Sequence, residues 1–175
     1  MRVVGFAVSV CVAIACACSG AASAQSLYKG GHWFDELARP YDLQALNGRY
    51  AIVTFAYGAC RKVCSTSLQL MQQLQQRAQE RHLALNFVVF GIDPEHDKPA
   101  DWAQLRRDRH IDAPNWAFLS GDAASIARVA RGLGVRYWRY GEHTMHDFRI
   151  VLLSPSGTIV RSIDAFDEDL EALLP

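Results

Sequence analysis

Residues 50–64 read YAIVTFAYGACRKVC, and this stretch decides the fold class. Its first eight residues are almost continuously apolar and rich in β-branched and aromatic side chains, which indicates a strand buried on both faces. Cys60 and Cys64 follow the strand with three residues between them. From Ser65 to about His82 apolar residues recur at helical spacing. The stretch therefore predicts a strand, a cysteine loop and a helix, in that order.

The flanking sequence extends this unit into an α/β fold. The patterns predict strands at 83–92, 116–119, 148–153 and 158–163, and helices at 99–110, 122–132 and 166–174. Asn47-Gly48, after the alternating residues 42–46, predicts an N-terminal β-hairpin, while residues 25–40 are expected to be irregular. We therefore expect a thioredoxin-like α/β sandwich with an N-terminal β-hairpin and a central insertion.

The first 24 residues have the layout of a secretory signal peptide. Arg2 precedes an apolar run, and Ala22-Ser23-Ala24 forms an A-x-A cleavage site. The run is too short and too rich in small residues to favour a membrane span. We predict a signal peptide at 1–24, a single domain at 25–175 and export to the periplasm. Ala13-Ile14-Ala15-Cys16 loosely resembles a lipobox, so a lipid tether to the outer face of the inner membrane is the alternative.

Charge and cysteine content narrow the function classes. Without the leader the chain has 17 basic and 18 acidic residues, which gives no basic face for nucleic acid. Three of the five cysteines lie in the leader, so Cys60 and Cys64 are the only thiols of the mature chain. In an exported protein, one structural disulfide in a binding module is a possible role for such a pair.

The cysteine loop suits either metal binding or redox chemistry. The dipole of the following helix and the basic Arg61 and Lys62 favour thiolates, which are both nucleophiles and metal ligands. If both cysteines were helical, their Cβ atoms would lie about 5–6 Å apart. A disulfide prefers roughly 3.8 Å, whereas one ion with metal–sulfur bonds of about 2.3 Å spans the gap. The spacing favours a metal, and a loop position for Cys60 keeps the disulfide open.

A metal site needs a further ligand, and histidine is the obvious source. The mature chain has six: His32, His82, His96, His110, His143 and His146. His82 and His110 fall at predicted helix C-termini, where a partly positive ring complements the dipole. His143 and His146 precede a predicted buried strand, on a segment that can fold back over the cysteines.

Four segments, taken together, carry a family resemblance. They read TFAYGACRKVC (54–64), GIDPEHDKP (91–99), WAFLSG (116–121) and HDFRIVLLSPSG (146–157). In this order they resemble the Sco/SenC family of copper-delivery proteins, which help to assemble cytochrome c oxidase. The landmarks run from about residue 52 to residue 160, which is most of the mature chain.

The resemblance implies that Cys60, Cys64 and His146 bind copper, one ion per monomer. His146 holds the family position, rather than His143, because the strand and turn after it keep register. Asp93 matches the family's aspartate near the site, as a residue that orients the loop or a ligand; a turn-forming role before Pro94 is the alternative. Two thiolates and an imidazole suit Cu(I) or Cu(II).

The sequence departs from the family pattern in three places. Arg61 and Ser65 stand where the family usually has proline after each cysteine, and Asp147 replaces a serine after the histidine. Losing two prolines predicts a looser loop with altered metal affinity and redox potential. All three ligand types remain. Zinc also fits this set if a fourth ligand comes from His143, Met145 or Asp93.

The leading functional hypothesis is a monomeric periplasmic metallochaperone. It would pass copper to the copper-receiving subunit of cytochrome c oxidase or to another copper protein, without nucleic acid. Membrane contact would come only through the partner or a lipid anchor. The alternative is an enzyme, a thiol-disulfide oxidoreductase in which Cys60 and Cys64 reduce the oxidase's copper-site cysteines.

The aromatic and basic stretch at 136–140 allows two structural interpretations. It either packs its aromatics on a strand with the arginines in solvent, which we expect, or forms a docking surface for the partner.

Overall fold

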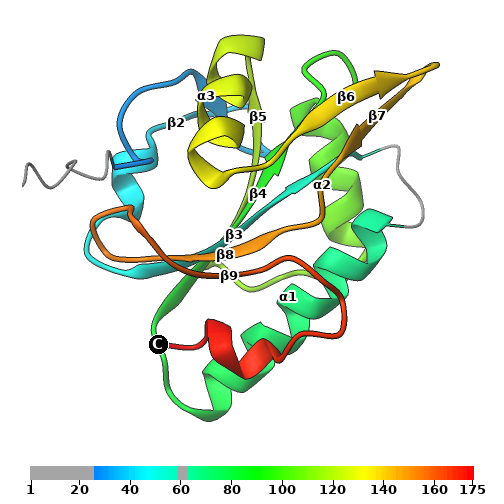
Figure 1. The fold of residues 1–175 in the computed structure, drawn as a ribbon. Coiled ribbons are helices and arrows are strands. Elements are labelled where there is room, and N and C mark those ends of the chain that lie inside the picture. The colour runs from blue at the N-terminus through cyan, green and yellow to red at the C-terminus, as the bar shows by residue number, and fades with distance from the viewer. Residues whose placement is uncertain (1–25, 59–62) are drawn as a thin grey trace, which may run out of the picture.

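A seven-stranded mixed sheet forms the centre of the molecule (Figure 1). The computed structural model describes residues 26–58 and 63–175. Its elements are β1 Trp33–Phe34, β2 Pro40–Tyr41, η1 Leu43–Leu46, β3 Tyr50–Ala56, α1 Val63–Glu80, β4 Leu85–Gly91, α2 Pro99–Asp108, β5 Trp116–Gly121, α3 Ala123–Leu133, β6 Tyr137–Tyr140, β7 His143–His146, β8 Ile150–Leu153, β9 Ile159–Ile163 and η2 Leu170–Leu173.

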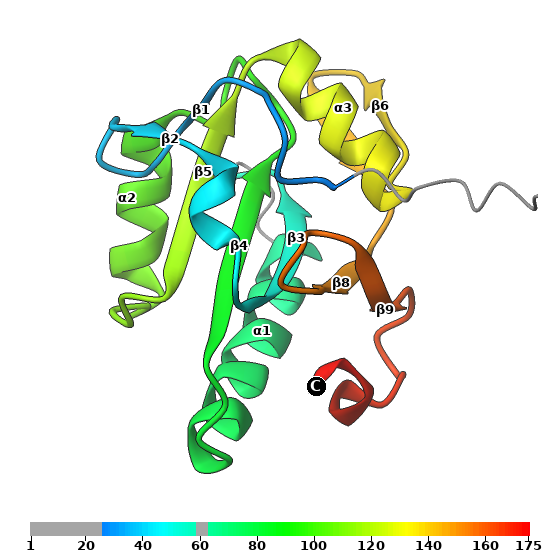
Figure 2. The same cartoon turned by 90° about the vertical axis from the view of Figure 1, so that its left-hand side faces the viewer.

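The strand order is β2-β1-β5-β4-β3-β8-β9, and β6 and β7 form a separate two-stranded sheet. Strands β3, β4 and β5 are parallel, whereas β8 runs antiparallel to β3. Right-handed crossovers place α1 and α2 on one face of the sheet, and the return from β5 to β8 carries α3 across the other face (Figures 1 and 2). The predicted α/β sandwich is confirmed.

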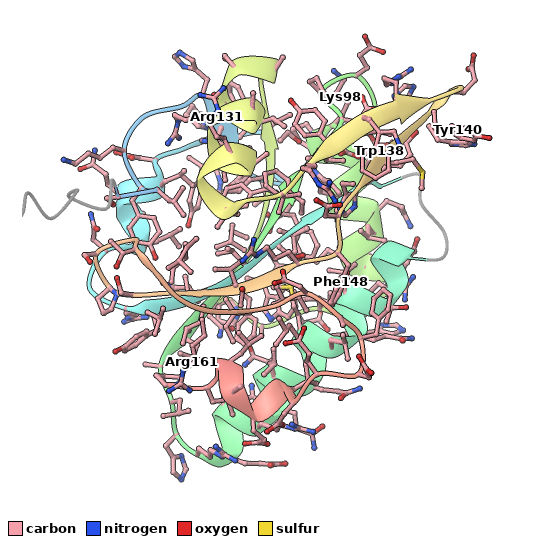
Figure 3. All side chains as sticks on the ribbon, in the orientation of Figure 1. Lys98, Arg131, Trp138, Tyr140, Phe148 and Arg161 are labelled. Carbon is pink, nitrogen blue, oxygen red and sulfur yellow. The ribbon has the colours of Figure 1, made fainter. Side chains whose placement is uncertain are left out.

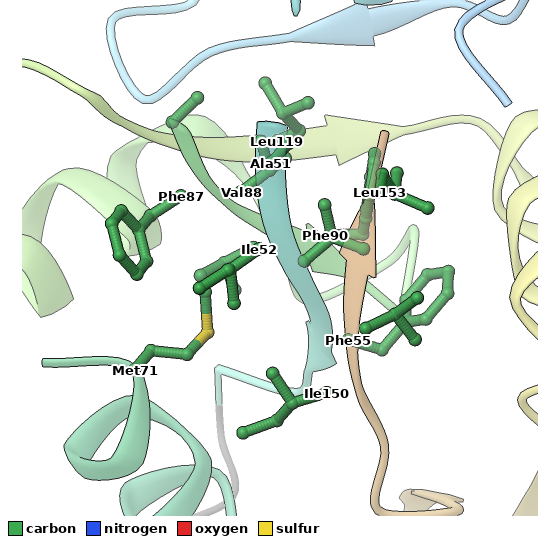
Figure 4. Packing of buried hydrophobic residues seen from close by; sticks show 14 of the residues in the cluster. Ala51, Ile52, Phe55, Met71, Phe87, Val88, Phe90, Leu119, Ile150 and Leu153 are labelled. Carbon is green, nitrogen blue, oxygen red and sulfur yellow. The ribbon is translucent and has the colours of Figure 1, made fainter. Parts of the chain in front are cut away.

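The core explains why the central strands have no polar face. From Ala51 to Ala56, every residue of β3 is buried, because helices or the N-terminal segment cover both sides of the sheet. Met71 of α1 reaches the sheet beside Ile52 and Phe87 (Figure 4). Phe90 meets Phe55 and Trp33, with ring centroids 5.5 and 5.0 Å apart.

Most predicted elements lie within a few residues of their expected bounds. Asp122 caps α3 by accepting the N–H of Ser125 at 2.7 Å. Gly134 ends that helix, with φ of 70° in the left-handed region that glycine favours. Phe166–Leu174 differs from the predicted helix, because only Leu170–Leu173 is helical there, as a 3-10 turn.

The N-terminal hairpin exists, but the predicted location was wrong. Residues 43–46 form the 3-10 helix η1, capped by Asp42, which accepts the Gln44 N–H at 2.9 Å. The hairpin is formed by β1 and β2, within or beside the segment expected to be irregular, and β1 also pairs with β5. The segment forms a capped 3-10 helix rather than the hairpin that Asn47-Gly48 predicts, because the helix lets the apolar Leu43 and Leu46 both reach the core.

The topology gathers three loops at one edge of the sheet. The carboxyl ends of β3 and β4 and the amino end of β8 meet there. The chain after β3 leads to the cysteines, the chain after β4 carries Asp93, and the chain before β8 carries His146. In open α/β sheets this is where reactive groups gather. Among residues 26–58 and 63–175, no helix has both the length and the apolar character needed to cross a bilayer.

Candidate metal centre

The two cysteines are only partly within the described chain. Cys60 lies outside the described residues. Cys64 lies in the first turn of α1, which begins at Val63, two residues earlier than the sequence pattern predicts. Backbone N–H groups at a helix N-terminus carry partial positive charge and favour a thiolate at this position.

The segment that leads to Cys60 is fixed by a buried carboxylate. The N–H of Gly58 donates to Asp97 Oδ1 at 2.7 Å, and the N–H of Asp93 donates to Asp97 Oδ2 at 2.8 Å. The carbonyl of Asp97 accepts the hydroxyl of Ser120 at 2.6 Å. Asp97 thus joins the chain after β3 to the loop after β4.

Close packing and burial set the electrostatics of Asp97. A Cβ on Gly91 would come within 2.8 Å of the Asp97 Cβ, so only glycine lets the loop approach β4 this closely. Burial raises the pKa of Asp97 to about 6, and the bonds from the Asp93 and Gly58 N–H groups oppose the shift without cancelling it. Its described hydrogen-bond donors are backbone amides rather than cationic side chains.

Asp93 is the second anchor and holds the β6–β7 hairpin. Its Oδ2 accepts the hydroxyl of Thr144 at 2.7 Å and pairs with Arg139 at 3.2 Å. Burial raises the pKa of Asp93, but the bonds from Thr144, the Glu95 N–H and His96 outweigh burial, so the pKa lies below its ordinary value. The contacts with Thr144 and Arg139 orient the hairpin. Asp93 also accepts the Glu95 N–H at 2.9 Å, which is a turn-forming bond.

A second charged pair closes the base of the hairpin. Arg136 makes a two-bond contact with Asp147, at 2.8 Å from Nε and 3.1 Å from Nη2. The N–H of Asp147 also donates to the Arg136 carbonyl at 3.0 Å. The side-chain bond to Arg136 lowers the pKa of Asp147. The residue that replaces the family's serine therefore has a structural partner in this chain.

His146 has the surroundings of a neutral imidazole. Its Nδ1 lies 2.8 Å from the Asp147 carbonyl, which can only accept, so Nδ1 carries a proton and the neutral ring has its lone pair on Nε2. Burial lowers the pKa of His146, although the Asp147 carbonyl and carboxylate act in the opposite direction. Metal-binding histidines usually donate their second N–H to such an oxygen, so this ring fits a ligand role.

The pleat of β7 separates its four side chains into two faces. Thr144 and His146 face the Asp93 loop, Thr144 buried and His146 half-buried, while His143 and Met145 are exposed on the other face. His143 and Met145 therefore point away from the face that carries His146. His82 and His110 follow the ends of α1 and α2, as predicted.

The aromatic stretch at 136–140 differs from our expectation. Its aromatics are exposed rather than packed, with 49% of Trp138 and 74% of Tyr140 accessible (Figure 3). Its arginines are ion-paired, Arg136 with Asp147 and Arg139 with Asp93. Among the described residues, the aromatics of this hairpin stay exposed because the hairpin lies outside the main sheet.

A group of possible ligands also lies around Asp93. One ligand atom from each of Asp93, Glu95 and His96 falls within 4.8 Å of the others. The guanidinium of Arg139 and the hydroxyl of Thr144 already contact Asp93 Oδ2. Arg139 thus supplies a positive charge to the Asp93 carboxylate, and Thr144 supplies a hydrogen bond. These contacts fit a role in orienting the hairpin better than a role as a metal ligand.

Sequence reasoning missed Asp97, Thr144 and Arg139 as parts of this centre. Asp97 lies in the GIDPEHDKP segment, four residues after Asp93, where it could have been found as a second acid in one loop. Thr144 and Arg139 gave no such signal, because their contacts with Asp93 cross 51 and 46 residues of sequence.

Comparisons with known proteins bear on the family and the fold of this chain. The family model described as SCO1/SenC matches residues 29–174. A SCO1 protein homolog from Bacillus subtilis is 22% identical over 129 residues, which cover 71% of this chain and 67% of that protein. Among solved structures, copper-bound ScoI from Arabidopsis thaliana has a TM-score of 0.72 at 19% identity and covers 85% of this chain and 93% of its own.

A further solved structure is BsSco, described with a disulfide switch as a member of the Sco family of cytochrome c oxidase assembly proteins. It has a TM-score of 0.72 at 18% identity, covering 83% of this chain and 88% of its own. At these identities the structures support the fold, which is thioredoxin-like. Because the family model spans most of the sequence, this chain belongs to the SCO1/SenC family.

Proposed function

We propose that this protein is a copper metallochaperone that binds one copper ion through Cys60, Cys64 and His146. Copper is its cargo, and the recipient is the copper-receiving subunit of cytochrome c oxidase or another copper protein. The proposal includes export: residues 1–24 act as a signal peptide, and 25–175 work as a monomer in the periplasm. A lipid on Cys16 would tether the protein to the outer face of the inner membrane.

The convergence of two anchored segments carries this proposal. Asp97 bonds the backbone of Gly58, two residues before Cys60, and also the backbone of Asp93. Asp93 in turn bonds Thr144, two residues before His146 on the same face of β7. These bonds form a relay of two carboxylates, Asp97 and Asp93, which links the chain before Cys60 to strand β7.

The strand register points the same way. Thr54 of β3 pairs with Ile150 of β8, and its hydroxyl donates to the Arg149 carbonyl at 2.8 Å. The pairing ends there, so the chain that leaves β3 toward the cysteines and the chain that enters β8 from β7 lie at the same edge of the sheet.

The ligand chemistry suits a cargo ion. Two thiolates and one imidazole form a soft set that prefers Cu(I) and accepts Cu(II) with an added oxygen ligand. With three ligands the coordination stays open, so a partner's thiolate or imidazole can enter before a ligand of this protein leaves. The Asp147 carbonyl holds Nδ1 of His146, which keeps Nε2 in the metal-binding tautomer.

The relatives support the copper assignment. The A. thaliana ScoI neighbour has copper bound, and BsSco is described as belonging to a family of cytochrome c oxidase assembly proteins. These properties belong to those proteins, and their extension to this chain is part of the proposal.

The test is metal binding by residues 25–175. We expect one tightly held copper per monomer after reconstitution with Cu(I), measured by metal analysis beside a thiol titre. Cys60→Ser should largely abolish this binding, and His146→Ala should weaken it strongly.

His82→Ala is the matched control, because it removes an exposed imidazole after the end of α1 and should leave copper unchanged. Full stoichiometric affinity in Cys60→Ser would overturn the proposal.

A thiol-disulfide oxidoreductase is the second candidate. The position of Cys64 in the first turn of α1 favours it, since that environment also activates a thiol for exchange. The disulfide switch described for BsSco is consistent with such chemistry in a relative. His146→Ala separates the two functions: a reductase keeps its thiol-exchange rate in this variant, whereas a copper carrier loses metal. A very low reduction potential without metal uptake would indicate a structural disulfide instead.

A further inference from the structure

The β6–β7 hairpin carries several soft and aromatic side chains that are exposed to solvent. Four of the nine large hydrophobic side chains exposed in the described residues lie on this hairpin: Tyr137, Trp138, Tyr140 and Met145. Figures 1 and 3 show the hairpin extending beyond the main body, with Tyr140 near its tip. So dense a group on eight strand residues calls for a role other than packing.

The strand register defines which of these side chains share a face. Trp138 lies opposite Met145, and Tyr140 lies opposite His143. Alternation along each strand then puts these two pairs on one face and Tyr137 on the other. The opposite face is fixed independently, because Thr144 and Arg139 both reach Asp93. The outer face thus presents a thioether, an imidazole and an indole ring together.

The spacing allows one ion to touch these groups. Directly opposite side chains have Cβ atoms about 4.5–5.5 Å apart, which sets the Trp138 ring beside the Met145 sulfur. His143 and Met145 are two residues apart on one strand, roughly 6.7 Å along it. An ion bonded to each at about 2.0–2.3 Å fits between the imidazole nitrogen and the sulfur.

We propose that His143 and Met145 form a second, accessory site for a soft monovalent cation, Cu(I), with the Trp138 ring against the bound ion. A thioether and a neutral imidazole select Cu(I) over hard cations. The indole face adds cation–π attraction. The site shares no ligand with the site formed by Cys60, Cys64 and His146, so this proposal can be tested independently of the proposed function.

Its position suits loading of the main site. Met145 precedes His146 in the chain, and the two side chains lie on opposite faces of β7. An ion held at the tip of an exposed hairpin is accessible to a donor before it reaches the buried side of the same strand.

The experiment uses residues 25–175 with Cys60→Ser and Cys64→Ser, so that thiolate binding is removed. Ag(I) serves as a redox-inert probe, and Cu(I) is then measured by competition with a chromogenic chelator. Trp138 is the reporter, because the other three tryptophans, Trp33, Trp102 and Trp116, are buried and at most 4% exposed. We expect Ag(I) to quench the exposed indole emission with one-to-one saturation.

Ligand variants decide the assignment. Met145→Leu keeps the shape and removes the sulfur, and His143→Gln removes the imidazole; each should weaken Ag(I) and Cu(I) binding at least about tenfold. Trp138→Phe should lose the fluorescence signal and weaken binding only about two- to fivefold in the chelator competition.

His82→Gln is the control and should bind like the parent. The proposal is overturned if the double serine variant takes up no Ag(I) or Cu(I), or if Met145→Leu and His143→Gln bind as tightly as their parent. Retained copper binding at the cysteines in the Met145→Leu chain would leave the proposed function intact, so failures of the two proposals are distinguishable.

Discussion

The two segments that approach the proposed copper site are held by opposite kinds of contact. Gly58 follows β3 in the centre of the sheet, and its anchor Asp97 is buried and bonded to backbone N–H groups. The β6–β7 hairpin lies outside the main sheet, and its anchors Asp93 and Asp147 pair with Arg139 and Arg136. Burial and backbone hydrogen bonds therefore hold the segment that leads to Cys60, while ion pairs hold the hairpin that carries His146.

The difference has a consequence for pH. The pKa of Asp97 is raised to about 6 and that of Asp93 is lowered, although only four residues separate them. Burial dominates for Asp97, and hydrogen bonds outweigh burial for Asp93. Mild acid therefore protonates the anchor of Gly58 before it protonates the anchor of the hairpin.

The largest effect is expected where packing alone acts. Phe90→Ala removes a buried ring that contacts Phe55 and Trp33, and should lower the free energy of unfolding by about 3–5 kcal/mol. Denaturant titration measures the loss. Phe34→Ala, at a side chain that is 44% exposed, is the control and should cost much less. Equal losses in the two variants would contradict a packing-dominated centre.

The second effect is the pH dependence contributed by Asp97. Between the ordinary pKa of 3.8 and about 6, Asp97 binds a proton in the folded protein only, so the stability that Asp97 contributes is largest below that window. As pH rises through about 6, the contribution of Asp97 to the free energy of unfolding should fall by up to about 3 kcal/mol. Denaturant titrations from pH 4 to pH 7 measure this slope.

Asp97→Asn cannot titrate, so its curve should lack this part of the slope. Glu95→Gln, at an exposed carboxylate in the same loop, is the control and should follow the native curve. Parallel curves for the native protein and Asp97→Asn would show that Asp97 has an ordinary carboxyl pKa.

The third effect is confined to the hairpin. Thr144→Val keeps the side-chain shape and removes the hydroxyl that donates to Asp93, so it should cost about 1.5–3 kcal/mol. We also expect weaker copper binding, because His146 lies on the loosened face of β7. Thr158→Val, in the β8–β9 turn, removes a hydroxyl bonded to Ser154 at 2.8 Å and should leave copper affinity unchanged. Copper affinity that falls equally in both variants would argue against the relay.

The smallest effect is expected at the base of the hairpin. Asp147→Ser restores the family residue and removes the exposed pair with Arg136. Global stability should hardly change, because exposed ion pairs contribute little. Amide hydrogen exchange should nevertheless rise in β6 and β7 and stay constant in β3. Unchanged protection in β6 and β7 would show that Asp147 does not hold the hairpin closed.

Much of the fold follows from local pattern. The continuous apolar run at 50–57 predicts a buried strand, and the Met and Leu spacing after Cys64 predicts the helix that covers it. The N-terminal hairpin was placed wrongly because Asn47-Gly48 is a local signal, whereas Leu43 and Leu46 join a core built from distant strands. The exposure of Trp138 and Tyr140 likewise depends on tertiary structure, because β6 and β7 form a separate sheet outside the main one.

The sequence by itself determined the thioredoxin-like class, the cysteine pair at a strand-to-helix junction and the family landmarks, because each depends on residues close together in the chain. Only the tertiary structure decided how Asp97 and Asp93 link Gly58 to Thr144, and which face of β7 carries His146. Those contacts join segments 39 and 51 residues apart, and a carboxylate's partners are fixed only when strand order and register bring distant donors within hydrogen-bond range.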